Sequence, residues 1–225
     1  MTAWEVTKIW DASRIQSYRR FVAKQGPKRT GNARFTCEDL AIRLVTEFAA
    51  AEGLPLVFAN DAHPTGLSPT GFADKDKFLD VVLTSTGASD LLTYKTVMPV
   101  PGSTMSNSNS LRRAAPGDLI ILYRRRRHVQ VVTAASPTRV TIVQGNFRPR
   151  SERCSLLRRL FQNHNQNRPS DRCYIGEIVR QQTYRYDAKA REWLYSGSPS
   201  DVFKDHGQVV IWNFVAWNQL APSKR

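Results

Sequence analysis

One segment of the chain carries apolar residues at the spacing of an α-helix. Leu40, Leu44 and Phe48 follow one another at positions i, i+4 and i+8, so they share one helix face. The helix is expected to begin near Cys37 and to end at Gly53, because glycine readily adopts the backbone conformation that closes a helix. It is the clearest element that the hydrophobic pattern predicts.

Further helices are predicted on either side of this one. One spans about residues 12–24, and another spans about residues 74–83. The rest of the region 60–117 has no regular pattern, and its part from 99 to 117 is polar and is expected to form a long loop. A loop of this length in a compact domain is often a lid or a binding element, and the alternative is a disordered insertion.

The second half of the chain changes to the pattern of a β-sheet. The apolar runs cover residues 118–123, 128–133, 139–144, 174–180 and 208–216. A Ser-Pro-Thr segment at 136–138 separates the second and third runs as a tight hairpin. The segment 154–163 is a candidate helix within a polar, basic stretch.

The predicted helix that begins near Cys37 carries polar residues at its start. Thr36 is a suitable N-cap, and Asp39 stands three residues later, which predicts a capping box. Cys37 would be the first helical residue, where unpaired amides and the helix dipole stabilise a thiolate. Glu38 and Asp39 oppose that effect, so a thiolate would also need a nearby imidazolium. The alternative is an inert cysteine within a helix.

The predicted hairpin brings a histidine beside an amide side chain. With the turn centred on Ser136, His128 pairs directly with Gln144, and directly opposed Cβ atoms lie about 5 Å apart. Asn146 follows on the same face, one pleat along. A side-chain carbonyl holds the orientation and tautomer of an imidazole, as the third member of a nucleophile–base–orienter arrangement does. The alternative is a strand histidine that a neighbour satisfies.

The remaining cysteines and histidines give weaker patterns. His63, His164 and His206 lie in polar segments without an adjacent orienting group, so they are expected at the surface. Cys154 and Cys173 either pair in an oxidising compartment or are small buried hydrophobes. A zinc site formed by these two cysteines and His164 lacks a recognisable ligand spacing.

The composition adds information about size and partners. With 225 residues the chain can bury a core, and one domain is the default expectation. The formal net charge of +14 favours a polyanionic partner, such as a nucleic acid, an anionic membrane face or a bacterial cell wall. The sequence has no apolar run long enough to span a bilayer and no basic-then-apolar start, so neither a transmembrane segment nor a cleaved secretory signal is expected.

Four short segments, taken in chain order, resemble a family of cysteine hydrolases. They are Thr-Cys-Glu-Asp-Leu at 36–40, Pro-Gly-Asp-Leu-Ile at 116–120, His-Val-Gln-Val-Val at 128–132 and Val-Gln-Gly-Asn at 143–146. In this order they look like the CHAP and NlpC/P60 amidases of the papain-like superfamily. The CHAP branch is the most similar, because its final strand usually ends in Glu-x-Asn. The resemblance covers about a third of the chain.

The resemblance implies an α+β, papain-like fold in which the nucleophile-bearing helix packs on an antiparallel β-sheet. It implies a single domain over residues 1–225, with a core at about 30–147 and a C-terminal elaboration with extra strands at about 148–225. The region 60–115 would be an insertion without a counterpart in the family. Enzymes of this type cleave amide bonds in peptidoglycan without a metal or a cofactor.

The resemblance also assigns roles to individual residues. Cys37 would be the nucleophile, and its main-chain amide would help to form the oxyanion hole. His128 would be the general base and then the general acid. Gln144 would orient the imidazole, with Asn146 assisting. Gln144 stands where the family usually has an acidic residue, so the orienting group is neutral here.

Three functional hypotheses follow from these observations. The first is a cysteine amidase or endopeptidase that cleaves bacterial peptidoglycan. It would be made in the bacterial cytoplasm, exported without a cleaved signal peptide by a type VI-like apparatus, and active in the periplasm or wall of a competitor, with an immunity protein as a further partner. The second is a papain-like protease, deamidase or transacylase toxin with a protein substrate.

The third hypothesis is a basic nucleic-acid-binding protein. Arg124–Arg127 and the arginines within Arg148–Arg159 would contact phosphates in that case. The sequence carries no helix-turn-helix, zinc-finger or RNA-recognition signature, so we do not expect a nucleic acid as a partner.

Overall fold

The computed structural model describes residues 1–123, 127–149, 174–198, 203 and 207–220. The helices in these ranges are α1 (Ala12–Gln25), α2 (Cys37–Glu52), α3 (Lys75–Ser85), α4 (Ala88–Thr93) and α6 (Phe214–Leu220), with short 3-10 helices η1 (Pro27–Arg29) and η2 (Ser108–Arg113). The strands are β1 (Arg34–Phe35), β2 (Phe58–Asn60), β3 (His63–Leu67), β4 (Val97–Pro99), β5 (Leu119–Leu122), β6 (His128–Ser136), β7 (Arg139–Gln144), β8 (Phe147–Pro149), β9 (Tyr174–Ile178), β10 (Arg180–Asp187), β11 (Glu192–Tyr195) and β12 (Gly207–Trp212).

An antiparallel sheet is the frame of the molecule. In the described residues it has seven strands in the order β11-β10-β7-β6-β5-β12-β4. The strand β12 lies between β5 and β4, so the region after residue 148 contributes a central strand as well as outer ones. Two small antiparallel sheets, β1-β9-β8 and β2-β3, accompany it. The protein is therefore α+β with antiparallel sheets, which confirms this part of the fold that the resemblance implies.

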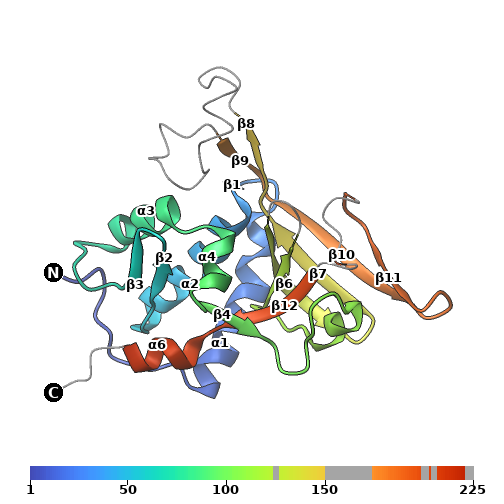
Figure 1. Ribbon diagram of the computed structural model, residues 1–225, viewed down its shortest axis with the longest axis horizontal. Helices are drawn as coiled ribbons and strands as arrows, with labels where there is room; N and C mark the ends of the chain where they lie inside the picture. Colours follow the sequence, from blue (N-terminus) through green and yellow to red (C-terminus); the bar gives the residue numbers. More distant parts are fainter. Residues whose placement is uncertain (124–126, 150–173, 199–202, 204–206, 221–225) are drawn as a thin grey trace.

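The α-helices gather at the left of the view, and the β10–β11 hairpin, which forms one edge of the seven-stranded sheet, extends away from them to the right (Figure 1). Alternate residues of β5, β6 and β7 point to opposite faces. On the α2 face the sheet buries Leu119, Ile121, Val129, Val131 and Val143. On the other face it buries Ile120, Leu122, Val132, Val140 and Ile142. Burial on both faces explains why these strands appear in the sequence as nearly continuous apolar runs.

Helix α2 forms as its apolar spacing predicts, with its start and end at the expected residues. Thr36 is the N-cap in an extended conformation, and Gly53 closes the helix in the left-handed region at φ 66°. The predicted capping box is wrong at its first residue, because the Thr36 hydroxyl is buried and makes no hydrogen bond. Packing against the sheet stabilises α2 without this cap, as tertiary packing does for most helices in proteins.

The region 60–117 is more regular than the sequence indicates. The predicted helix near 74–83 is α3, with Asp74 as N-cap, and the strand β4 and the helices α4 and η2 follow it. Leu111 of η2 is fully buried in the core on the far face of the sheet. The interpretation of this segment as a disordered insertion is therefore wrong, because long-range packing orders a segment that has no periodicity of its own.

The last apolar run divides into a strand and a helix. The strand β12 ends at Trp212, and α6 begins at Phe214. Asn213 explains the change, because its side-chain oxygen accepts the Ala216 N–H at 3.2 Å, as an N-cap does. The candidate helix at 154–163 lies outside the described residues. None of the helices in the described ranges is both long and apolar enough to cross a membrane.

Candidate active site

The hairpin between β6 and β7 differs from the predicted register. Ser136 pairs with Arg139, so the turn lies at Pro137–Thr138 and is not centred on Ser136. A bulge then shifts the pairing between Val132 and Ala134, and beyond it Val131 pairs with Val143. The predicted direct pairing of His128 with Gln144 is therefore wrong, since this register continues to Gln130 opposite Gln144.

The bulge decides on which face the histidine lies. Without it, the turn register would set Gln144 opposite Val131 and would direct its side chain to the α2 face, away from His128. The extra residue of the bulge shifts the pairing by one position, so that Gln144 turns to the face on which His128 lies. As a result His128, Gln130 and Gln144 share one face, and His128 Nε2 lies 2.8 Å from Gln144 Oε1.

A chain of hydrogen bonds sets the direction of this contact. The Tyr184 hydroxyl donates to Gln130 Oε1 at 2.9 Å, so the other end of that amide is the donor. Gln130 Nε2 donates to Gln144 Oε1 at 2.8 Å. Gln144 Oε1 is therefore an acceptor, and His128 must donate to it from Nε2. A neutral His128 then carries its proton on Nε2 and its lone pair on Nδ1, the state of a general base.

The far end of Gln144 is held as well. Its Nε2 donates to Gln182 Oε1 at 2.6 Å, and the Tyr195 hydroxyl donates to the same oxygen. The rings of Tyr184 and Tyr195 stack with centroids 4.4 Å apart. Gln130, Gln182 and the two tyrosines are not among the site residues that the sequence predicts. A polar Gln130 inside an otherwise apolar strand was the available signal, because a buried amide needs partners.

The thiol of Cys37 is buried, with 1% of the side chain exposed. Its Sγ donates to Glu38 Oε2 at 2.7 Å. Burial raises the pKa of this thiol well above its usual range, and the charge and hydrogen bond of Glu38 raise it further. The main-chain N–H groups of Val129 and Glu38 interact with the sulfur and offset part of the increase. The predicted opposition of Glu38 to thiolate formation is confirmed in direction.

The thiol and the imidazole approach β6 from different sides. Cys37 belongs to the core of the α2 face, together with Val129 and Val131. The His128 ring points to the other face, where it meets Gln144. The sulfur reaches the main chain at Val129, one residue from His128, while its hydrogen bond goes to Glu38. The structure thus joins imidazole and carboxamide directly, and it brings the thiol to the adjoining backbone but not into hydrogen-bond contact with the ring.

The glycine of the Gln-Gly-Asn segment allows this close approach. A Cβ on Gly145 would lie 2.2 Å from the carbonyl oxygen of Phe35 and 2.6 Å from that of Thr36. The chain leading into α2 therefore passes directly over the end of β7. Beside it, Gln144 and Asn146 line a hollow of about 240 Å³, so Asn146 lies near the orienting residue as predicted from the resemblance. Cys37 and His128 do not line this hollow.

The Pro-Gly-Asp-Leu segment shapes a turn. Gly117 has φ 87°, and a Cβ there would lie 2.8 Å from the Tyr18 ring. Asp118 is 1% exposed, accepts the Ala115 N–H at 2.8 Å and lies 3.7 Å from Arg19. Burial raises the pKa of Asp118 to about 7, against the opposing effects of the Ala115 N–H and the Arg19 charge. This carboxyl holds the turn before β5.

His63 lies apart from this site, in the two-stranded sheet of β2 and β3. His63 is half-buried, and its main-chain N–H donates to Asn60 Oδ1 at 2.8 Å. Cys154, Cys173, His164 and His206 lie outside the described residues, as does any disulfide or zinc site that would use them. Among the residues that the structure describes, no cluster of three or more His, Cys, Asp or Glu side chains could hold a metal ion.

Comparisons of the chain with protein-family models, with curated proteins and with solved structures find no match.

Proposed function

We propose that this protein is a cysteine hydrolase that cleaves amide bonds. One observation carries the proposal: a cysteine at the first turn of a buried helix contacts the main chain of β6 one residue from His128, whose ring Gln144 orients. Sulfur, imidazole and orienting carboxamide are the parts of a nucleophile, a base and its positioning group. The proposal includes the papain-like fold that the resemblance implies.

The proposed reaction follows from these three groups. His128 Nδ1 accepts the thiol proton as the sulfur attacks the carbonyl carbon of the amide. The imidazolium then donates that proton to the departing amine, which leaves a thioester on Cys37. Water attacks the thioester with His128 as base, and this step releases a carboxylic acid and restores the thiol. Main-chain N–H groups at the start of α2 would stabilise the oxyanion.

The described state is a resting state in this mechanism. The thiol is buried, protonated and bonded to Glu38, so it is a poor nucleophile as it stands. Substrate binding must expose the sulfur and bring it within hydrogen-bond reach of His128. Because the sulfur and the ring lie on opposite faces of β6, the mechanism requires a rearrangement of the start of α2 or of the start of β6 when substrate binds.

Bacterial peptidoglycan is the proposed substrate. The net charge of +14 favours retention on an anionic polymer, and the wall carries both the charge and the amide bonds that such a site would cleave. Action as an antibacterial effector in the periplasm or wall of a competitor, countered by an immunity protein, is the biological role that we propose with it.

Purified sacculi test the enzyme and its substrate together. We expect the wild-type protein to release muropeptides, and we expect Cys37→Ala and His128→Ala to release none while keeping the wild-type circular dichroism spectrum. His63→Ala is the matched control, since His63 lies apart from the site. Full hydrolysis by Cys37→Ala would disprove the mechanism. Intact sacculi, with Cys37-dependent cleavage of a peptide or a protein, would instead favour the protein-directed hydrolase.

A further inference from the structure

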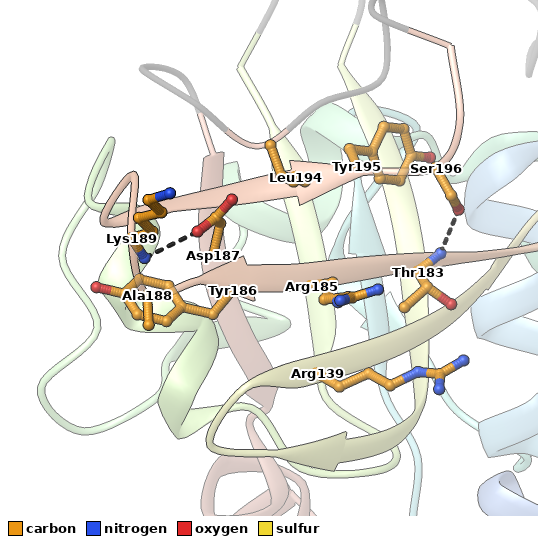
Figure 2. A pocket seen from close by; sticks show the side chains of 10 residues that line it. All are labelled: Arg139, Thr183, Arg185, Tyr186, Asp187, Ala188, Lys189, Leu194, Tyr195 and Ser196. Atoms are coloured by element: carbon orange, nitrogen blue, oxygen red, sulfur yellow. Dashed lines mark hydrogen bonds between the residues drawn. The ribbon is translucent and has the colours of Figure 1, made fainter.

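A second hollow lies on the sheet face near the β10–β11 hairpin, away from the proposed active site. Figure 2 shows its lining residues, which come from β7, β10 and β11 and from the turn between the last two. It has a volume of about 820 Å³. Arg139, Arg185 and Lys189 supply positive charge to it, and Leu194, which is 48% exposed, supplies an apolar surface.

Two of these cations are directly opposed across the sheet. Arg139 of β7 pairs with Arg185 of β10 in the antiparallel register, so their side chains share one face. Like charges placed directly opposite each other destabilise a sheet. Both arginines are exposed, and neither forms an ion pair in the described part of the chain. An anion that accepts hydrogen bonds from both arginines would offset the repulsion between their charges.

The acidic residue of this hollow offsets only part of the charge of the pair. Asp187 accepts the N–H groups of Lys189 and Ala190 at 2.8 and 3.1 Å, which fixes it in the turn. These N–H groups lower the pKa of Asp187, and the charge of Arg185 adds to the effect. The Asp187 carboxylate is therefore held by the N–H groups of the turn, and the three cations outnumber it, so the hollow keeps an excess of positive charge.

The hollow lies on the same sheet face as the thiol. Side chains of β7 alternate, so Arg139 and Thr141 point to the face on which Val143 meets the core that contains Cys37. At about 3.3 Å per residue, Arg139 lies roughly 20 Å along the strand from Gly145, over which the chain enters α2. Val143, which lies between them, is fully buried beside Gly26 at the end of α1, so a ligand that reaches both places must pass outside α1.

We propose that Arg139 and Arg185 form an anionic subsite for peptidoglycan, which holds a carboxylate of the stem peptides while the wall is cleaved at Cys37. The inference rests on the proposed function. Hydroxyls of Thr183 and Ser196 and the apolar Leu194 suit a peptide or a sugar ring. The nearby aromatic rings are less available to nucleic-acid bases, because Arg112 covers a face of Tyr186 and Tyr184 stacks on Tyr195.

Co-sedimentation with sacculi tests the subsite without hydrolysis. The Cys37→Ala protein serves as the parent, and Arg139→Gln/Arg185→Gln is added to it. We expect the double substitution to weaken sacculus binding at least about tenfold, since it removes two charged donors. Lys75→Gln/Lys77→Gln on α3 is the control with the same change in charge, and it should weaken binding less than about twofold. Equal losses in the two variants, or no binding by the parent, would overturn the proposal.

Chemistry on the wall identifies the anion. Sacculi whose carboxylates have been converted to amides should bind the parent as weakly as untreated sacculi bind the arginine variant. Unchanged binding to amidated sacculi would overturn the carboxylate assignment. An equal loss of binding to a short DNA duplex and to sacculi would reveal a general polyanion surface and would overturn the subsite.

The two proposals fail in different ways. If the wild-type protein releases no muropeptides but the arginine variant loses sacculus binding, the hydrolase is wrong and the wall-binding subsite stands. If hydrolysis depends on Cys37 while the arginine variant binds sacculi normally, the subsite is wrong and the hydrolase stands. Unfolding would not explain a loss of binding, because removal of a like-charge pair should leave stability unchanged or increased.

Discussion

His128 Nε2 lies 2.8 Å from Gln144 Oε1, although the strand register sets Gln130, and not His128, opposite Gln144. The contact is diagonal across the hairpin, and a long amide side chain reaches it. Gln130 occupies the opposed position and donates to the same oxygen, so one carbonyl accepts from two buried groups. This shared acceptor fixes both the ring orientation and its tautomer.

Removal of the shared acceptor should weaken activity and stability together. Gln144→Ala leaves the buried amide of Gln130 without this acceptor, which costs roughly 1–3 kcal/mol in unfolding free energy. We expect turnover to fall about tenfold, less than the roughly 10²–10⁴-fold expected for loss of a general base. Gln144→Glu keeps an acceptor oxygen and should recover part of the activity. Urea unfolding and muropeptide release are the measurements, and an unchanged turnover in Gln144→Ala would exclude the orienting role.

The hydroxyl of Tyr184 should control the tautomer of His128 at a distance. Tyr184→Phe removes the donor that holds Gln130 Oε1, so the Gln130 amide can reverse and disturb the acceptor at Gln144. We expect the ¹⁵N spectrum of the neutral ring to change from the Nε2–H tautomer to a mixture. Tyr186→Phe is the control, because Tyr186 packs against Arg112 and Trp193 on the same sheet face. A single Nε2–H tautomer in Tyr184→Phe would show that the relay does not set the proton position.

The reactivity of Cys37 should increase when the charge beside it is removed. Burial is the main cause of its raised pKa, and Glu38 is the next. Glu38→Gln keeps the side-chain shape and removes the charge, so the thiol pKa should fall and alkylation by iodoacetamide near pH 8 should become several-fold faster. Glu47→Gln, on the same helix but paired with Arg29, should leave the rate unchanged. A slower reaction in Glu38→Gln would contradict this assignment of the cause.

Asp118 should make the protein less stable as the pH rises. The pKa of Asp118 is about 7 in the folded protein and ordinarily 3.8, so between these two pH values the folded protein binds a proton that the unfolded chain has lost. Its contribution to stability is complete below about pH 3.8 and is lost as the pH rises through about 7.

Asp118→Asn should remove this dependence, because it keeps the acceptor for the Ala115 N–H without a charge. We expect the variant to gain stability over the wild type by a few kcal/mol at most at pH 8, since each pKa unit corresponds to about 1.4 kcal/mol. The gain should disappear towards pH 4. Urea unfolding at both pH values is the measurement, and a constant difference between the two proteins would contradict the sign.

Local patterns were sufficient to predict most elements of the site. The spacing of Leu40, Leu44 and Phe48 predicted α2, and Gly53 predicted its end. The apolar runs predicted β5 and β7 to within one residue and the start of β6, although β6 continues three residues beyond the predicted end, so His128 was assigned to a strand start. These features depend on side-chain periods and on caps, which neighbouring residues determine among themselves.

Tertiary packing decided how these elements meet. The bulge near Thr133 depends on how two strands fit against cores on both faces, and no local pattern records it. The burial of Cys37 against β6, the contact of His128 with Gln144, and the bond from Tyr184 to Gln130 all join residues distant in sequence. The sequence by itself therefore determined α2, the strands β5, β6 and β7 and the reactive side chains on them. Only the three-dimensional structure decided their register, their faces and their protonation, because these depend on long-range contacts.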